Sequence, residues 1–242
     1  MPLAAKPYLS RISIHEDAAF DEDGYPFSIP AVRNMGTIEP HADVTFFVGE
    51  NGAGKSTILE AIAVGMGLPS EGGSRDVSRS EQQASPLHES LKLSRSFRKP
   101  KASYFLRAES LFNVFSYYDA VDSPRAGLHQ RSHGEAFMDV MLDFRPGGLY
   151  LLDEPEAALS PSRQMAALVA IHQLVQQECQ FIIATHSPIL LSYPNAKILL
   201  FDGSGISEVA YEDTEHFAIT RDFLNHYERR LQRLLTDARD DV

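Results

Sequence analysis

Residues 44–57 read Val-Thr-Phe-Phe-Val-Gly-Glu-Asn-Gly-Ala-Gly-Lys-Ser-Thr, and this stretch decides the fold class. The apolar run 44–48 is typical of a strand buried in a parallel sheet. The part from Gly49 to Thr57 matches the phosphate-loop pattern Gly-x-x-x-x-Gly-Lys-Ser/Thr. Its backbone N–H groups and the positive end of the next helix can hold phosphate oxygens. The stretch therefore predicts a nucleotide site between a strand and a helix over Lys55–Met66.

Within this loop the pattern assigns a role to each residue type. We expect Lys55 to reach the β- and γ-phosphates and the Ser56 hydroxyl to coordinate Mg²⁺. The alternative is a glycine turn that binds nothing, and the apolar strand before the loop and the helix after it disfavour that alternative. The predicted nucleotide-binding residues are Asn51, Gly52, Ala53, Gly54, Lys55, Ser56 and Thr57.

A second apolar run, Leu149–Leu152, ends in the acidic pair Asp153-Glu154. The carboxyl ends of strands in α/β sheets are where ligands bind. Successive strand residues point to opposite sides, so the two carboxylates are expected to have different roles. Asp153 suits a Mg²⁺ shell, and Glu154 suits the orientation or deprotonation of an attacking water. A solvated strand end is the alternative, which a neighbouring phosphate loop makes weak.

Composition restricts the class of protein. The chain has 242 residues, 43% of them hydrophobic and 23% charged, which excludes disordered and disulfide-stapled proteins. Twenty-two Lys and Arg against 33 Asp and Glu give a net charge of −11, which disfavours indiscriminate binding to nucleic acid or anionic membranes. The single Cys179 fits a reducing compartment, and no apolar run approaches the roughly 18 residues of a membrane span. We expect a cytoplasmic protein that makes no membrane contact.

Buried strands that alternate with helices indicate an α/β core. Short strands are expected at 9–15, 25–29, 104–106 and 181–184, with a hairpin over 197–210. Residues 69–101 are expected to form an exposed excursion with one short helix over 87–93. A helix beginning at Pro161 is expected to bury a stripe of Met165, Leu168, Val169, His172 and Val175. An amphipathic helix is expected over 220–235.

The order of these motifs resembles that of an ABC-type ATPase domain over nearly the whole chain. In that family a phosphate loop, a signature motif, an acidic strand end, a D-loop and a switch histidine follow one another. They correspond here to 49–57, Ser132–Glu135, 149–154, 156–161 and His186. The resemblance implies an α/β fold with a P-loop NTPase core of ABC-ATPase type, an N-terminal antiparallel β subdomain and a small helical signature subdomain. It also implies that His186 senses the γ-phosphate.

Departures from the family pattern favour one subgroup. The signature reads Ser-His-Gly-Glu, and the D-loop has Ala-Ala-Leu-Ser-Pro without the aspartate that transporter subunits carry. This wording is similar to that of stand-alone ATPases of the AAA-family, ABC-like group, which are related to chromosome-maintenance and DNA-repair ATPase heads. The Q-loop glutamine is replaced, with Arg107 or Glu109 near its position. Glu109 is a further candidate for the Mg²⁺ site.

Two other groups of side chains leave alternatives open. Tyr25 and Phe27 are candidates for adenine stacking or for the core. The basic residues Lys92, Arg95, Arg98, Lys99, Lys101 and Arg107 form either a solvated face or a contact with a nucleic-acid backbone, and the solvated face is favoured. We expect one ABC-like domain over 1–242, with a helical signature insertion at about 69–145 and a C-terminal helix within 211–242.

The resemblance implies the binding and hydrolysis of ATP with Mg²⁺. Two copies of the chain would hold two nucleotides head to tail, with Ser132 and Gly134 of one copy completing the site of the other. Glu154, His186 and Lys55 are the expected catalytic residues. The alternatives are a nucleotide-gated interaction module with little turnover, an ATPase subunit of a DNA-maintenance or defence complex, and a transporter subunit, which the D-loop disfavours. An unidentified protein partner is compatible with all of these.

Overall fold

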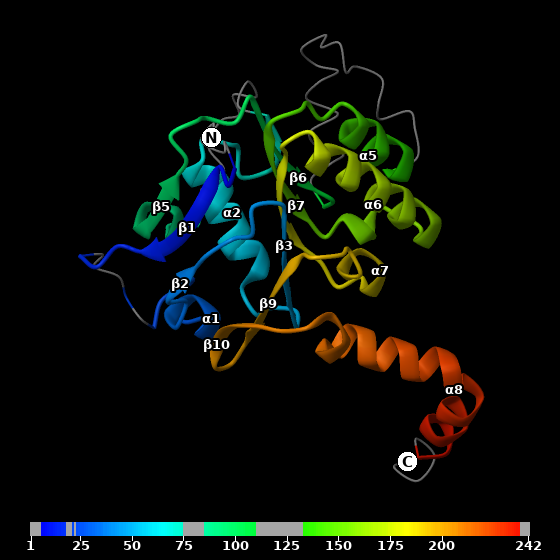
Figure 1. The fold of residues 1–242 in the computed structure, drawn as a ribbon. Coiled ribbons are helices and arrows are strands. Elements are labelled where there is room, and N and C mark those ends of the chain that lie inside the picture. Colours follow the sequence, from blue (N-terminus) through cyan, green and yellow to red (C-terminus); the bar gives the residue numbers. More distant parts are fainter. Residues whose placement is uncertain (1–5, 18–20, 22, 75–84, 110–132, 238–242) are drawn as a thin grey trace.

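The computed structural model describes residues 6–17, 21, 23–74, 85–109 and 133–237. Its centre is a seven-stranded sheet with the order β10-β9-β3-β8-β7-β6-β4 (Figure 1). The strands β3 (Val44–Gly49), β8 (Gln180–Ala184), β7 (Gly148–Asp153), β6 (Ala102–Arg107) and β9 (Lys197–Asp202) run parallel. β4 (Gly73–Ser74) and β10 (Gly205–Glu208) are antiparallel edges. The α/β fold of ABC-ATPase type is confirmed.

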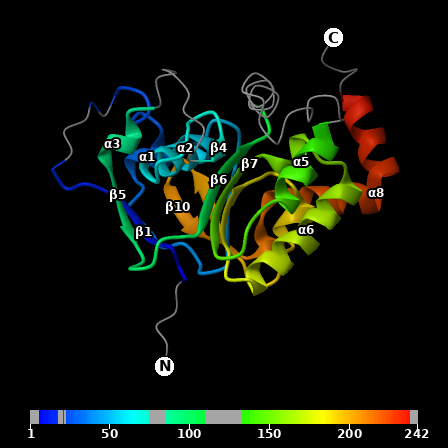
Figure 2. The same ribbon diagram turned by 90° about the horizontal axis from the view of Figure 1, so that it is seen from above.

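Adjacent residues of the central strands enter two different cores. Phe46 and Phe47 are both fully buried, but on opposite faces of the sheet. One face is covered by α5 (His133–Leu142), α6 (Pro161–Gln176) and α7 (Pro188–Leu191). The other is covered by α2 (Lys55–Gly65) and the N-terminal elements (Figure 2). Because both faces are covered, these strands are mostly apolar and do not alternate in polarity.

The N-terminal elements include a separate antiparallel sheet of β2 (Thr37–Ile38), β1 (Leu9–Ile14) and β5 (Leu91–Arg95). Ile12 of β1 pairs with Ile38 on one side and Leu93 on the other. The expected helix over 87–93 is therefore wrong in its second half, since α3 spans only Leu87–Ser90. Residues 91–95 (Leu-Lys-Leu-Ser-Arg) instead form β5, which pairs antiparallel with β1.

The strand expected at 25–29 is also wrong. These residues form turns that lead into the short helix α1 (Pro30–Arg33). Pro26 and Pro30 lack the backbone N–H that a strand ladder requires, and proline is favoured at the first turn of a helix. The segment therefore brings Tyr25 close to the phosphate loop, where its hydroxyl is 3.3 Å from Thr57 Oγ1.

Helix α6 begins at Pro161 as expected, but the face that it buries differs from the predicted stripe. Met165 and Val169 are 56% and 58% exposed. The buried face consists of Gln164, Ala167, Ala170, Ile171, Leu174 and Val175. Small alanines let the helix lie close to the sheet, and the Gln164 amide is satisfied by hydrogen bonds to Leu159 O (2.9 Å) and Ser187 Oγ (2.5 Å). Hydrophobicity alone could not reveal this orientation.

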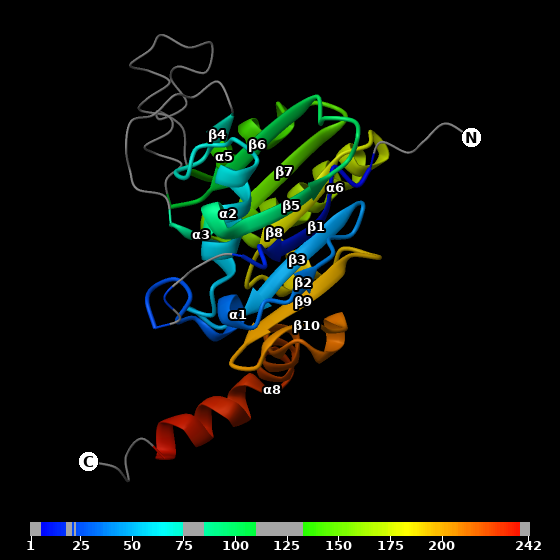
Figure 3. The same cartoon turned by 90° about the vertical axis from the view of Figure 1, so that its left-hand side faces the viewer.

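The C-terminal part contains the expected β9–β10 hairpin and then α8 (Glu215–Asp237). α8 begins five residues before the predicted helix, has a non-helical residue at His226, and extends away from the sheet (Figure 3). Its side chains at Leu224, Leu231 and Leu234 are exposed. In the described ranges, none of the helices is both long enough and apolar enough to cross a bilayer.

Candidate active site

The phosphate loop connects β3 to α2, and its glycines are required by geometry. Gly49 has φ +142°, and a Cβ there would lie 2.2 Å from the carbonyl oxygen of Phe201. Gly54, with φ +98°, is the N-cap of α2. Both backbone conformations are unfavourable for residues with a side chain. The loop therefore presents its N–H groups at the start of a helix, which is the arrangement that binds phosphate.

Lys55 is 4% exposed, and its ammonium group donates hydrogen bonds to the carbonyl oxygens of Gly49 (2.8 Å) and Glu50 (2.9 Å). Burial lowers its pKa, which the neighbouring carboxylates of Glu154 and Asp153 oppose. The amine is thus held inside the curve of the loop, where a bound phosphate chain would meet it.

The acidic strand end lies directly beside the loop. Ser56 Oγ donates to Asp153 Oδ1 at 2.9 Å, although the two residues are 97 positions apart. Asp153 is 3% exposed, and burial raises its pKa to about 6 while Arg107 and the Ser56 hydrogen bond lower it. A hydroxyl and a carboxylate are oxygen donors suited to Mg²⁺. The described residues contain no group of three or more His, Cys, Asp or Glu side chains that could enclose a metal, so phosphate oxygens and water would complete the shell.

Glu154 has a left-handed backbone conformation, with φ +48° and ψ +52°, which is uncommon for a residue with a side chain. Its N–H donates to Ala184 O on the neighbouring strand at 2.9 Å. The Glu154 carboxylate lies beside His186, with its Oε1 3.7 Å from His186 Nε2. Backbone strain of this kind is concentrated at functional sites.

A third carboxylate, Glu156, organises the loop that carries the histidine. Its Oε2 accepts a hydrogen bond from Thr185 Oγ1 (2.6 Å), and its Oε1 accepts one from the His186 N–H (2.5 Å). Ser187 Oγ then caps α7 by accepting from the N–H groups of Ile189 and Leu190. Sequence reasoning placed Glu156 only in the D-loop, and no local signal connects it to residues 29 or 30 positions away.

Lys55, Ser56, Asp153, Glu154 and His186, which the sequence predicts as one site, thus lie at the carboxyl ends of three neighbouring strands. A profile described as "AAA domain" matches residues 28–115, and one described as "AAA domain, putative AbiEii toxin, Type IV TA system" matches 136–192. The hemin import ATP-binding protein HmuV of Pseudomonas aeruginosa is 31% identical over 183 residues, covering 64% of this chain and 71% of that protein. The chain belongs to the ABC-type ATPases. It carries the P-loop ATP hydrolase domain of that family.

Other relatives of this ABC-type domain are much longer proteins. The brefeldin A resistance protein of Schizosaccharomyces pombe is 26% identical over 212 residues, which cover 76% of this chain. The match spans only 14% of that protein's length. Among solved structures, the SMC head domain from Thermotoga maritima is 15% identical with a TM-score of 0.45, over 83% of this chain and 98% of that one.

Arg107, at the end of β6, lies beside the acidic strand end of this ABC-type site. Its Nη1 is 2.9 Å from Glu60 Oε2, and its Nε is 3.2 Å from Asp153 Oδ2. Arg107 therefore does not belong to the surface cluster with Lys92 and Arg98, in which the sequence grouped it. It lies beside the acidic strand end, in the region where a Q-loop residue was expected. Glu109 is exposed and close enough to raise the pKa of Asp153.

The two aromatic candidates for adenine stacking separate clearly. Phe27 is 6% exposed and belongs to the core under α2, whereas Tyr25 is 65% exposed. Tyr25 lines a cleft of about 400 Å³ together with Asn51, Gly52, Gly54, Lys55, Ser56, Thr57 and Glu154. Only Tyr25 of this pair is available to a nucleotide.

The signature motif falls partly outside the described residues, since Ser132 lies there. Gly134, in the first turn of α5, is buried against the D-loop. A Cβ on Gly134 would lie 2.7 Å from Ala158 O and 2.4 Å from Arg163 Nη1. Glu135 forms an ion pair with Arg163 (3.2 Å). Neither of the two clefts beside the phosphate loop is lined by a described residue of α5.

The second cleft beside the phosphate loop, of about 450 Å³, extends from Gly49–Ala53 to the first residues of α8. Sequence reasoning did not include α8 in the site. His216 lines this cleft, and its Nε2 is 2.8 Å from Nδ1 of His186. A histidine near the start of a helix carries no signal that would reveal this contact.

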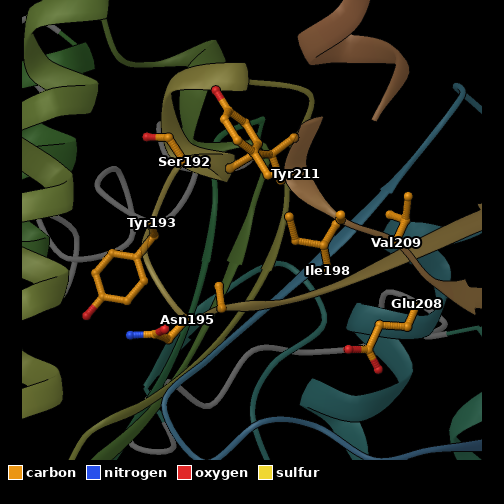
Figure 4. A pocket seen from close by; sticks show the side chains of 10 residues that line it. Ser192, Tyr193, Asn195, Ile198, Glu208, Val209 and Tyr211 are labelled. Carbon is orange, nitrogen blue, oxygen red and sulfur yellow. The ribbon is translucent and has the colours of Figure 1, made fainter. Parts of the chain in front are cut away.

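A third cavity, of about 370 Å³, is lined by Tyr193, Ile198, Glu208, Val209 and Tyr211 among others (Figure 4). None of the predicted site residues lines it. Three of its polar groups have protein partners: Tyr211 OH donates to Pro188 O (2.8 Å), Tyr193 OH is 3.2 Å from His172 Nδ1, and Glu208 pairs with Lys197.

Proposed function

We propose that this ABC-type ATPase binds ATP with Mg²⁺ between two copies of the chain and that hydrolysis opens the dimer. The observation that carries the proposal is that Lys55, Asp153, Glu154 and His186 all lie at the carboxyl ends of neighbouring central strands. The two clefts beside the phosphate loop open at the same end of the sheet. Each is a group that phosphoryl transfer requires: a cation for the phosphates, a metal ligand, a carboxylate for water and a donor for the γ-phosphate.

The roles follow from the contacts. The loop N–H groups of 51–57 and Lys55 hold the phosphates, and Ser56 and Asp153 hold the metal, with exposed Glu109 as a further candidate. When bound, Mg²⁺ neutralises charge that develops on the phosphate oxygens. Glu154 orients or deprotonates the attacking water, since it lines the cleft at the phosphate loop and its carboxylate lies beside His186. His186 donates to the γ-phosphate.

A second copy is proposed because the signature residue Gly134 packs on its own D-loop, not on its own phosphate loop. We assign to Ser132 and Gly134 the completion of the partner's nucleotide site, and to the segment within about 69–145 the role of presenting them. The positive end of helix α5 would then face the γ-phosphate of the other copy.

The experiment is light scattering of Glu154→Gln with Mg·ATP and with Mg·ADP, together with phosphate release. We expect a dimer with ATP only, and turnover reduced at least about 100-fold. The control is Glu16→Gln, which changes an exposed carboxylate beyond β1. A Glu154→Gln protein that retains wild-type turnover would contradict the assignment. A protein that stays monomeric with Mg·ATP and with Mg·ADP would indicate that the surface completing the nucleotide site belongs to another protein.

A second candidate function is a nucleotide-gated interaction module with little turnover. The D-loop without aspartate and the exposed apolar residues of α8 favour it. In both cases we propose a cytoplasmic protein that is not coupled to a transporter, since its D-loop departs from the wording of transporter subunits. Steady phosphate release by the isolated wild-type chain would exclude the module. Co-purification with a membrane protein would restore the transporter alternative.

A further inference from the structure

We propose that His216 is a positioning residue for ATP hydrolysis, which holds His186 in the tautomer that carries its proton on Nε2. The proposal rests on the function proposed above and adds α8 to the machinery of the site. The ring of His216 is within hydrogen-bond distance of the ring of His186, and it is through His186 that it acts.

The first step is the contact between the two rings. His186 Nδ1 and His216 Nε2 are 2.8 Å apart, and the ring centroids are 4.9 Å apart with planes at 56°. Burial is the main cause that lowers the pKa of both imidazoles. The pair is therefore neutral at neutral pH, and a hydrogen bond between two neutral imidazoles requires one N–H and one bare nitrogen. Only two arrangements are possible.

The second step selects between these arrangements. His186 Nε2 is buried, has no hydrogen-bond partner among the described residues, and lies 3.7 Å from Glu154 Oε1. A bare nitrogen there would direct its lone pair at a carboxylate and at phosphate oxygens, which only accept hydrogen bonds. A proton on Nε2 would instead be attracted to both. His186 Nδ1 must then be bare, and His216 Nε2–H must donate to it.

The third step is that His216 is held firmly enough to do this. Thr214 is 2% exposed, donates to Tyr211 O (2.7 Å) and accepts from the Phe217 N–H (3.4 Å), which caps the start of α8. The rings of Tyr211 and Phe217 are 4.5 Å apart. Tyr211 OH donates to Pro188 O, two residues after His186. The first turn of α8 and the switch loop therefore form one packed unit.

Glutamine and asparagine distinguish this role from simple packing. A glutamine side chain places its amide N–H about where His Nε2 lies, whereas asparagine is one carbon shorter. We expect His216→Gln to retain most of the turnover, and His216→Asn and His216→Phe to lower kcat by about 10- to 100-fold, the usual effect of losing an orienting hydrogen bond. KM for ATP should remain nearly unchanged, because the phosphate loop is intact. His172→Phe, which removes a histidine bonded to Tyr193, is the matched control.

Two measurements make the test specific. Nitrogen-15 NMR of histidine-labelled, nucleotide-free protein should show His186 with its proton on Nε2, and His216→Phe should abolish this preference, with His186→Asn providing the assignment. In a His186→Gln background, where an amide N–H replaces Nε2–H without tautomers, His216→Phe should have much less effect on kcat than in the wild type.

The outcomes separate the two proposals. If the wild type does not hydrolyse ATP, the proposed function fails, and the NMR result still decides whether His216 sets the tautomer. If the wild type hydrolyses ATP while His216→Phe leaves both kcat and the His186 tautomer unchanged, the positioning role is overturned. The positioning role is also overturned if His216→Phe lowers kcat equally in the wild-type and His186→Gln backgrounds, since the effect of His216→Phe would then be structural.

Discussion

Arg107 forms an ion pair with Asp153 across two neighbouring parallel strands, with Nε 3.2 Å from Oδ2. The same guanidinium binds Glu60 from helix α2 through Nη1. One cation thus compensates two partly buried carboxylates at the point where Mg²⁺ is proposed to bind. Burial raises the pKa of Asp153 to about 6, and Arg107 is the first of the causes that oppose this rise. Arg107 therefore keeps the acidic strand end ionised.

The first prediction concerns the stability that Arg107 contributes. Arg107→Met removes the guanidinium that pairs with both Glu60 and Asp153, and removing one partner of a buried ion pair is strongly destabilising. We expect the free energy of unfolding, measured by urea denaturation at pH 7, to fall by about 2 kcal/mol. This is less than the effect of breaking a fully buried ion pair, because the Arg107 side chain is 22% exposed. Arg11→Met is the control: its pair with Glu39 on the N-terminal sheet is more than half exposed, and its loss should be below about 1 kcal/mol. Equal losses in the two variants would contradict this account.

How far the sequence predicts this site depends on how local each signal is. The strand and the helix on either side of the glycine loop lie where the sequence predicts them, because strand, glycines, lysine and helix are continuous in sequence. The pairing of Arg107 with Asp153 depends on which strand lies beside β6 and in which register the two strands pair. The residues around Arg107 in the sequence indicate neither. The same holds for Glu156 and His216, whose partners are 29 or more positions away.

Helix α6 shows a different limit. Its start at Pro161 follows from local rules for helix N-termini. Its buried face depends on how closely the helix approaches the sheet, which favours Ala167 and Ala170 over the larger Met165 and Val169. A polar residue, Gln164, also lies on the buried face because Leu159 and Ser187 satisfy it. Such a face is set by partners distant in sequence, so a hydrophobicity pattern predicts it poorly.

The second prediction concerns the lysine of the phosphate loop. Lys55→Met removes a charged donor from the phosphates, and a hydrogen bond from a charged group contributes about 1.5–3 kcal/mol. We expect ATP affinity to fall by roughly 10- to 100-fold, as measured by titration with a fluorescent ATP analogue. Lys92→Met on β5 is the control, since Lys92 is exposed and lines neither of the clefts beside the phosphate loop. An unchanged affinity in Lys55→Met would remove Lys55 from the nucleotide site.

The third prediction concerns the contact between the signature helix and the D-loop. In Gly134→Ala the new methyl group meets the carbonyl oxygen of Ala158 at 2.7 Å, and backbone there cannot move without displacing the D-loop. We expect a loss of about 1–3 kcal/mol in unfolding free energy, the usual effect of overpacking. Gly203→Ala is the matched control, because its Cβ would meet nothing within 4 Å. A Gly134→Ala protein as stable as Gly203→Ala would show that α5 can move away from the D-loop freely.

The last prediction concerns the dependence of stability on pH. In the folded chain the pKa values of His186 and His216 lie below the usual 6.5, first through burial. The charged groups that face the pair are Lys55, Glu154, Glu156 and Glu215; Lys55 lowers these pKa values and the carboxylates oppose it. On acidification the unfolded chain therefore binds protons before the folded chain does.

It follows that the stability contributed by the neutral pair is fully present above pH 6.5 and is lost as the pH falls below that value. The raised pKa of Asp153, about 6, has the opposite effect in this window, but it is common to all variants. We therefore expect the wild type to lose more free energy of unfolding between pH 7.5 and pH 5.5 than the double variant His186→Gln/His216→Gln, which has no imidazole to protonate there. His172→Gln, on the exposed side of α6, should behave like the wild type. Urea denaturation at each pH gives the change in unfolding free energy with pH for the wild type, the double variant and His172→Gln. If the double variant loses as much stability as the wild type, the pair is not neutral in the folded protein, and the hydrogen bond between the two rings involves an imidazolium.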